Sequence, residues 1–315
     1  MMVLPWWGGA AGQGRDSCSR QLQLRGALLL LMVAAAVPTA ALEDSNGCDF
    51  TGSGLGHESS GIQPVYLNCA SGRVEWQYPR AGLRVILRSP RKDRDFRACI
   101  RADQAFAGAR LFLEGHRSLI PLYSRDDGRP RELPRCFNSY KGKVALYVEA
   151  ETPVDAAKLK KQVAAFDYDL QTFAKGAVYD PLEECRPCSD EELLRMYCSA
   201  DFVARGTIVD VADEARLSRT MVTVKASKLY QQNQIIFRHE RHGDDTQNLI
   251  HTDGPGLTGK VEVPLQCGAR MGEGEFLLMG SLRLGDPILR CAPRFKEWEQ
   301  IVHKKRSQAH CVLEL

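Results

Sequence analysis

Short runs of alternating apolar and polar residues recur along the first half of the chain. Valine, leucine and aromatic residues fill these runs, and turn-forming clusters such as Asp-Gly-Arg-Pro at 127–130 separate them. A period of two, broken at turn residues, predicts short strands rather than long helices. The predicted strands cover residues 65–68, 73–78, 83–87, 109–113, 118–123, 144–149 and 166–173, with a short helix over 155–163. Regularly spaced short strands of this kind favour a β-sandwich.

The second half of the chain begins with the signature of a helix start. Ser189 is followed three positions later by Glu192, which is the pattern of a capping box, and apolar residues then recur at helical spacing. Strands are predicted over 202–211, 220–229, 260–265 and 275–284, and the polar stretch 231–259 between them is expected to be a surface loop. Strands between two terminal helices favour a small barrel.

The last predicted helix covers residues 294–306. Phe295, Trp298, Ile301 and Val302 fall on one face of it, and charged residues occupy the rest. This pattern indicates a helix that packs its apolar face against the barrel.

Residues 1–41 have the pattern of a secretory signal peptide. Arg15, Arg20 and Arg25 precede a 12-residue apolar run at 26–37, and Thr39-Ala40-Ala41 supplies small residues for cleavage. The alternative is an uncleaved anchor, but 12 residues in a helix span only about 18 Å of a hydrocarbon core about 30 Å thick. We therefore expect a secreted, extracellular product without membrane insertion.

The charge of the chain excludes one class of partner. The 315 residues carry a formal net charge of only +3, and removal of residues 1–41 reduces it to +1. A protein that binds nucleic acid through its overall charge would be strongly basic. We expect no nucleic-acid partner.

The cysteines divide the chain into two modules. Removal of Cys18 leaves ten cysteines, an even number that predicts five disulfides in an oxidising compartment. Four lie within residues 42–175 and six begin at Cys185, so a linker is expected at 176–184 and a second domain at 185–315. Local pairing in the first module would join Cys48 to Cys69 and Cys99 to Cys136. A redox or zinc role for the Cys-x-x-Cys at 185–188 is the alternative.

Signals for catalysis are poor. The sequence contains no HExxH, GxSxG or phosphate-loop motif, and the glycine-rich residues 51–56 lie beside a cysteine rather than between a strand and a helix. With every mature cysteine in a disulfide, no thiolate nucleophile remains. We expect neither an enzyme nor a bound cofactor or resident metal. A second possibility is a weak metal or pH-sensitive contact at His239, His242 and His251, in a segment that otherwise predicts a solvated loop.

A basic stretch at residues 88–101 is a candidate contact for heparan sulfate. Its cations are Arg88, Arg91, Lys92, Arg94, Arg97 and Arg101, diluted by Asp93 and Asp95. A plain solvated face is the alternative interpretation. Trp76 and Trp298 could anchor a protein partner if they faced solvent, but both positions favour the core.

Several motifs together resemble the meteorin family across the mature chain. They are GSGL at 52–55, VEW and YP at 74–79, CRPCSD at 185–190, DF and RG at 201–206, and RCAPRF at 290–295. VYL at 65–67 and DGRP at 127–130 resemble the meteorin-like branch most. The resemblance implies a CUB-like sandwich followed by a netrin-like (NTR) module with an OB-type barrel.

The resemblance also implies particular site residues. In NTR modules the cysteines pair first with fourth, second with fifth and third with sixth, which here gives Cys185–Cys267, Cys188–Cys291 and Cys198–Cys311. CUB domains often bind calcium through acidic side chains, for which Glu75, Asp93, Asp95 and Asp103 are possible oxygen donors without a matching spacing.

The function implied by the resemblance is that of a secreted signalling factor. Such a protein would bind a cell-surface receptor, with a KIT-type receptor tyrosine kinase as one candidate, and act in neuronal and glial development or as a hormone or cytokine. The alternatives are an extracellular-matrix or heparin-binding adaptor and a protease inhibitor of the NTR class. Inhibitors of that class use the free amine of the first cysteine, whereas Glu184 precedes Cys185 here. A non-covalent homodimer is left open.

Overall fold

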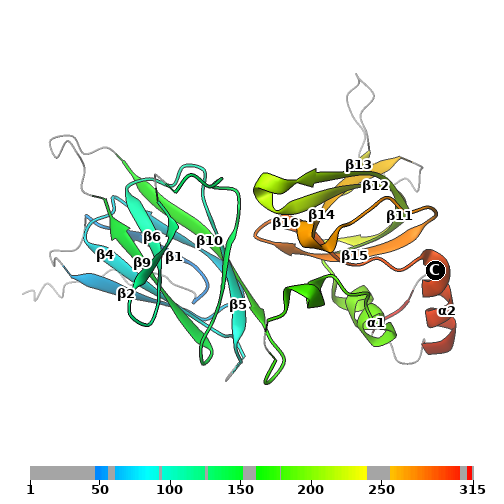
Figure 1. Cartoon of the computed structure of the whole chain (residues 1–315), viewed down its shortest axis with the longest axis horizontal. Coiled ribbons are helices and arrows are strands. Elements are labelled where there is room, and N and C mark those ends of the chain that lie inside the picture. Colours follow the sequence, from blue (N-terminus) through cyan, green and yellow to red (C-terminus); the bar gives the residue numbers. More distant parts are fainter. Residues whose placement is uncertain are drawn as a thin grey trace, which may run out of the picture. The chain divides into compact units, whose positions relative to one another are not determined.

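The computed structural model describes two β-rich modules (Figure 1). The described residues are 47–313, apart from 56–60, 92–93, 125–126, 152–160, 178, 240–255 and 306–310. The predicted signal peptide, most of the predicted helix at 155–163 and most of the histidine-rich segment therefore lie outside the described residues. Strands dominate the described part, so the prediction of a mainly β chain is confirmed.

The first module consists of two five-stranded sheets. Sheet I has the order β1-β3-β10-β5-β8, and sheet II has the order β2-β4-β9-β6-β7. The strands of sheet I are β1 (Phe50–Ser53), β3 (Ser71–Gln77), β10 (Val163–Thr172), β5 (Phe96–Ala102) and β8 (Arg135–Asn138). Those of sheet II are β2 (Ile62–Leu67), β4 (Gly82–Arg88), β9 (Lys143–Ala150), β6 (Ala109–Glu114) and β7 (Leu119–Tyr123).

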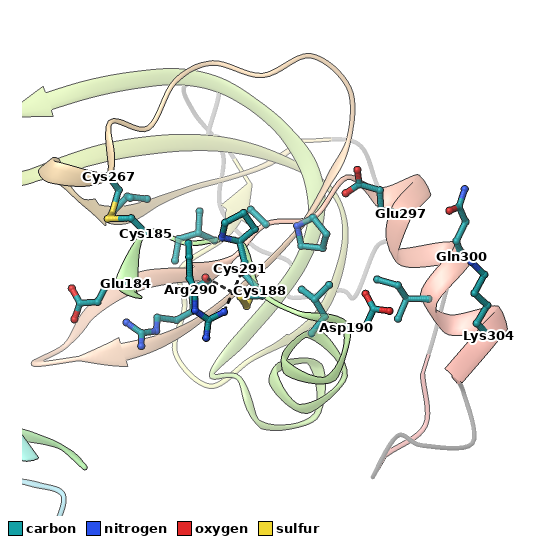
Figure 2. Close-up of a pocket in the computed structure, with 18 residues that line it drawn as sticks. Glu184, Cys185, Cys188, Asp190, Cys267, Arg290, Cys291, Glu297, Gln300 and Lys304 are labelled. Atoms are coloured by element: carbon teal, nitrogen blue, oxygen red, sulfur yellow. Dashed lines mark hydrogen bonds between the residues drawn. A yellow bond between two sulfur atoms is a disulfide. The ribbon is translucent and has the colours of Figure 1, made fainter. Parts of the chain in front are cut away.

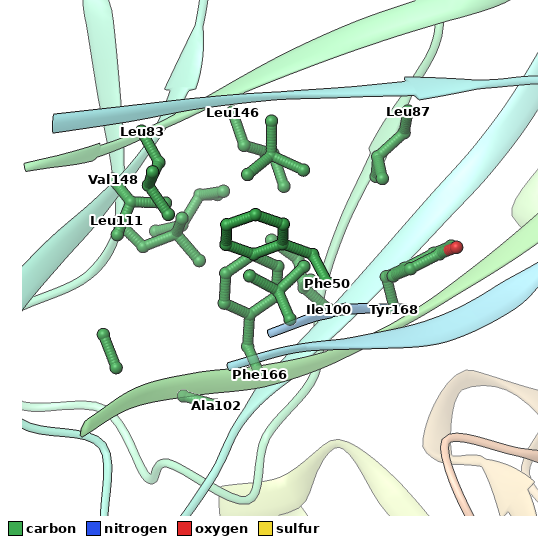
Figure 3. Close-up of a cluster of buried hydrophobic side chains, with 14 of the residues drawn as sticks. Phe50, Leu83, Leu87, Ile100, Ala102, Leu111, Leu146, Val148, Phe166 and Tyr168 are labelled. Carbon is green, nitrogen blue, oxygen red and sulfur yellow. The ribbon is translucent and has the colours of Figure 1, made fainter. Parts of the chain in front are cut away.

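Alternate residues of both sheets form a single core between them (Figure 3). From sheet I, Phe166 and Ile100 point into this core, where they meet Leu83 and Leu146 of sheet II, and all four are fully buried or nearly so. Burying an aliphatic or aromatic side chain of this size stabilises the fold by about 1.5–3 kcal/mol. The alternation of apolar and polar residues in the sequence thus corresponds to strands that bury one face between two sheets.

Strand β5 was not predicted from the sequence, in which residues 88–101 were interpreted as a basic stretch, either a contact for heparan sulfate or a solvated face. The structure places a strand over the second half of this stretch, where Phe96, Ala98, Ile100 and Ala102 are at most 5% exposed. Charged residues between them mask the alternation. The short strands β1 and β8 were not predicted either.

The second module is built around a closed ring of five strands. Strand β11 (Phe202–Glu214) pairs with β12 (Arg219–Gln232), β12 with β14 (Leu257–Pro264), β14 with β16 (Asp286–Cys291), β16 with β15 (Phe276–Arg283), and β15 with β11. The contact between β14 and β16 is parallel and the others are antiparallel. The remaining elements are β13 (Arg238–His239) and the short 3-10 turns η1 (Pro181–Glu184), η2 (Ala215–Leu217) and η3 (Leu265–Cys267).

The start of β11 (Phe202–Ala204) and the middle of β15 (Leu277–Met279) are buried on both faces of the sheet. Phe202 and Leu278 point into the barrel, whereas Val203, Leu277 and Met279 pack against the helices α1 (Asp190–Ser199) and α2 (Phe295–Lys305). Burial on two sides explains why these segments are almost continuously apolar. Neither helix of the described residues combines the length and hydropathy that crossing a bilayer requires.

The two helices meet over the outside of the barrel. The ring of Tyr197 on α1 stacks on Trp298 of α2, with centroids 5.0 Å apart and planes 17° apart. Phe295, Trp298 and Val302 are buried as the helical pattern predicts.

Gly280 of β15 permits the neighbouring strand β16 to approach, since a Cβ there would overlap the Ile288 carbonyl oxygen and the Phe202 ring. Strand β16 was not predicted from the sequence.

Five disulfides join the cysteines of the described residues. They are Cys48–Cys69, Cys99–Cys136, Cys185–Cys267, Cys188–Cys291 and Cys198–Cys311. Each of these pairs is one that the sequence analysis names. Two lie within the first module and three within the second.

Candidate functional site

A groove in the second module runs beside the segment that leads into α1 (Figure 2). It has a volume of about 600 Å³ and is lined by residues 184–190, the end of β16 and the outer face of α2. Glu297, Gln300 and Lys304 of α2 border it on one side, and Cys185, Cys188 and Arg290 lie opposite. Charged residues such as Glu184, Arg186 and Lys304 line it together with apolar ones such as Leu193 and Leu289, a mixture that differs from the mostly apolar lining of small-molecule sites.

Local capping fixes the segment along this groove. The Glu192 backbone N–H donates to the Ser189 hydroxyl at 3.4 Å, and the Ser189 N–H donates to the Glu192 carboxylate at 2.8 Å. The predicted capping box is therefore confirmed. Arg186 forms a two-pronged ion pair with Glu192 at 2.6 and 2.7 Å. This arginine, followed by the Ser189 N–H, lowers the pKa of Glu192 to about 2.

Two disulfides form one wall of the groove. Cys185 is bonded to Cys267 and Cys188 to Cys291, so the Cys-x-x-Cys motif at 185–188 holds no free thiol. A sulfur in a disulfide lacks the thiolate that nucleophilic catalysis and zinc ligation use. The two disulfides therefore fix this wall of the groove covalently.

The backbone amide of Cys185 is also occupied. Its N–H donates to the Leu182 carbonyl oxygen at 3.0 Å, at the end of the turn η1. A chelating amine at this position would require a free N-terminus with an available lone pair, and an amide nitrogen has none. In the intact chain the Cys185 nitrogen is therefore an amide that donates a hydrogen bond, not a free amine.

Ion pairs join the two helices at the rim of the groove. Lys305, in the last turn of α2, lies 2.8 Å from Glu191 and 3.2 Å from Asp190, in the first turn of α1. A cation at a helix C-terminus and anions at a helix N-terminus each complement the helix dipole. The pairs are exposed, so they orient the helices more than they stabilise them.

The three candidate calcium ligands that the structure describes, Glu75, Asp95 and Asp103, do not form a metal-binding group. Asp103 forms an ion pair with Arg73 at 2.6 Å, which lowers the pKa of that carboxyl, whereas Glu75 accepts a hydrogen bond from Gln77. Asp95 accepts hydrogen bonds from the Ser139 hydroxyl and the Gly142 N–H. The described residues contain no group of three or more His, Cys, Asp or Glu side chains that could hold a metal ion. Asp93, His242 and His251 lie outside the described residues.

The structure divides the basic stretch of residues 88–101 into two parts. Arg88 and Arg91 are exposed at the end of β4 and in the following connection. Arg94 is half buried and donates to the Phe173 carbonyl oxygen, and Arg101 is half buried on the outer face of sheet I. Lys92 lies outside the described residues.

Arg97 is held by two partners rather than free in solvent. It forms an ion pair with Glu184 at 2.8 Å, and its guanidinium lies 4.1 Å from the centre of the Tyr179 ring. These contacts make Arg97 a structural residue of sheet I in this arrangement. The linear run of six cations is thus not one continuous surface.

Two further cations, which were not identified from the sequence, lie at the same end of sheet II as Arg88 and Arg91. Lys141 lies in the connection before β9, and Lys143 begins β9 and is the register partner of Arg88. A cross-strand pairing over 55 residues of sequence leaves no local signal. Only the order of the strands in sheet II could have revealed this group.

The two tryptophans of the modules belong to the core. Trp76 is 2% exposed and Trp298 is fully buried, so neither presents its ring to a partner. The prediction that both favour the core is confirmed.

Taken together, the described residues form a mainly β chain of two modules, with disulfides inside each module and a groove in the second. Two family models cover these modules. A "Meteorin-like protein N-terminal domain" matches residues 50–179, and a "Meteorin, C-terminal domain" matches residues 187–305. The chain belongs to the meteorin family.

Individual relatives match over most of their length. Meteorin-like protein of Homo sapiens is 35% identical over 264 residues, which cover 82% of this chain and 79% of the relative. Meteorin-like protein of Danio rerio is 35% identical and covers 90% of this chain and 94% of the relative. Meteorin of Homo sapiens is 34% identical, with coverages of 82% and 86%. The similarity therefore extends to both branches of the family.

Proposed function

We propose that this protein is a secreted signalling factor that acts by binding a cell-surface receptor. Membership of the meteorin family is the observation that carries the proposal. Five disulfides support it, because such bonds persist in oxidising compartments and stabilise small domains against unfolding. In this proposal residues 1–41 are a signal peptide, 42–175 and 185–315 are the two domains, and 176–184 is the linker.

The domains are proposed to be a CUB-like sandwich and an NTR-like module. Two face-to-face sheets with one shared core support the first assignment. A closed five-stranded ring flanked by helices supports an OB-type barrel for the second. Both domains would act as rigid recognition surfaces without catalysis.

Export of the protein and the pairing of its cysteines are tested together on protein secreted by cultured cells. N-terminal sequencing is expected to find a new terminus near residue 42, and non-reducing peptide mapping is expected to recover the five pairs. Free thiols, or a bridge from a cysteine of residues 48–136 to one of residues 185–311, would contradict the proposed domain organisation.

Receptor action is tested by binding labelled protein to neural or glial cells. We expect saturable binding that unlabelled protein competes and that protease treatment of the cells abolishes. The ectodomain of a KIT-type receptor tyrosine kinase is a specific probe for surface plasmon resonance. Reduced and alkylated protein serves as the control, since it has the same sequence without the fold. Binding that heparinase removes completely would favour the matrix-adaptor alternative instead.

Inhibition of a metalloproteinase is the weaker alternative. In the NTR inhibitors the free amine of the first cysteine chelates zinc, whereas here the Cys185 nitrogen is an amide that already donates to Leu182. Nanomolar inhibition of a matrix metalloproteinase by the intact protein would favour this alternative.

Whether the protein forms a non-covalent homodimer is a separate question, which sedimentation velocity of the same preparation decides.

A further inference from the structure

One end of sheet II gathers five exposed cations: Arg88, Arg91, Arg117, Lys141 and Lys143. We propose that this group, the basic end of sheet II, binds a sulfated glycosaminoglycan. It differs from the linear stretch 88–101, because three of its members come from other segments. The inference relies on the proposed export of the protein but not on any particular receptor.

Strand pairing brings these residues to the same place. Arg88 ends β4 and lies opposite Lys143, which begins β9. The Ser89 N–H donates to the Gly142 carbonyl oxygen at 3.0 Å, so the connections that carry Arg91 and Lys141 are joined. Strand β6 runs antiparallel beside β9, and the hairpin from β6 to β7, which contains Arg117, therefore turns at this same end.

The cations of this end differ from other arginines of the sheet in their ion pairing. Among the described residues, none of the five cations forms an ion pair. Two arginines on the outer face of the same sheet do: Arg84 lies 2.7 Å from Glu114 and Arg110 lies 2.7 Å from Glu149. Unpaired cations repel one another, and a polyanion would relieve this repulsion.

The nearby Asp95 carries one negative charge, but among the described residues it forms no ion pair with any of the five cations. Its Oδ1 accepts hydrogen bonds from the Ser139 hydroxyl at 2.9 Å and the Gly142 N–H at 2.7 Å. These bonds hold the connection between β8 and β9 in place, and with it Lys141. The carboxylate thus helps to position Lys141, one of the five cations.

Two exposed aromatic rings favour a glycan over other polyanions. Tyr66 is 49% and Tyr140 73% exposed, and the side-chain cations of Arg88 and Lys141 lie 5.1 and 5.2 Å from the centres of these rings. A ring beside a cation offers a sugar both a stacking face and a partner for its sulfate. Anionic lipids concentrate in the cytoplasmic leaflet, so they are not the polyanion that an exported protein meets first.

The test compares two double variants of the mature protein. Arg88→Ser with Lys143→Ser removes two cations of the basic end, and Arg84→Ser with Arg110→Ser removes the same charge from ion-paired positions of the same sheet. Binding to a size-defined heparin fragment is measured at several salt concentrations. We expect the first variant to lose about tenfold in affinity and to show a shallower salt dependence by about two released counterions, and the second to change by less than about twofold. Circular dichroism serves as the check that both variants fold.

Three outcomes would overturn the site: no binding of wild-type protein to heparin, equal losses in the two variants, or preference for phosphatidylserine vesicles or a poly-glutamate peptide. A measurement on cells that lack heparan sulfate distinguishes failure of this glycosaminoglycan site from failure of the proposed receptor function. If the protein does not bind heparin but still binds these cells in a saturable, protease-sensitive way, the glycosaminoglycan site is wrong and the receptor function stands.

Discussion

Glu262 is a buried carboxylate whose ionisation couples the second module to pH. It is 7% exposed and forms an ion pair with Arg219. Its pKa is raised to about 7, mainly by burial and also by the negative charges of Asp286 and Glu214, while the positive charge of Arg219 opposes this rise. Because the pKa is higher in the folded than in the unfolded chain, the contribution of this group to stability is most favourable below about pH 4.5 and is lost as the pH rises through 7.

We predict that Glu262→Gln, which keeps the shape of the side chain, removes this dependence. Between pH 5 and 7.5 the free energy of unfolding of the wild type should fall relative to that of the variant by about 2 kcal/mol. Urea unfolding at each pH, followed by fluorescence, gives this difference and cancels the contributions of the histidines. Parallel pH profiles for the two proteins would show that Glu262 does not titrate in this range.

At the scale of elements, helix α1 depends on its capping box for the conformation of the groove. Ser189→Ala removes the side-chain acceptor of the Glu192 N–H and should destabilise the second module by about 1 kcal/mol. Thermal unfolding measures the loss, and Ser199→Ala is the matched control, because that serine donates only to the Arg195 carbonyl oxygen at the exposed end of the same helix. Equal effects of the two substitutions would contradict a specific role for the cap.

At the scale of the whole molecule, disulfides are expected to stabilise each module separately. The Cys198–Cys311 bond closes a loop across 113 residues and joins α1 to the C-terminal segment, where Leu313 is 2% exposed. On the chain-entropy estimate its loss costs about 4–5 kcal/mol. Replacing both cysteines by serine should therefore lower the unfolding temperature of the second module in calorimetry. The unfolding temperature of the first module should stay unchanged.

The bond between Cys99 and Cys136 supplies the reciprocal experiment. It joins neighbouring strands of sheet I across 37 residues, so its removal should lower only the transition of the first module. If either double variant shifted both transitions equally, the modules would unfold as one unit and the proposed linker at 176–184 would be wrong.

Much of the fold could be predicted from local patterns. The capping box placed α1, the apolar stripe with Phe295, Trp298 and Val302 placed α2, and alternation placed strands such as β3 and β9. Strand β5 escaped because arginines stand between its buried residues, and β16 because its residues are all of intermediate burial until Cys291. A strand can be predicted from its sequence only where its buried positions are clearly apolar and its exposed positions clearly polar.

The sequence by itself determined the mainly β character, the two helices and the family, because these depend on the spacing of residues close together along the chain. Only the tertiary structure decided which segments meet. It closed the barrel through β12 and β14, placed α2 beside the two disulfides of the groove, and brought Lys143 opposite Arg88. Such contacts depend on strand order and register, which arise from the joint burial of distant apolar residues and have no local signature.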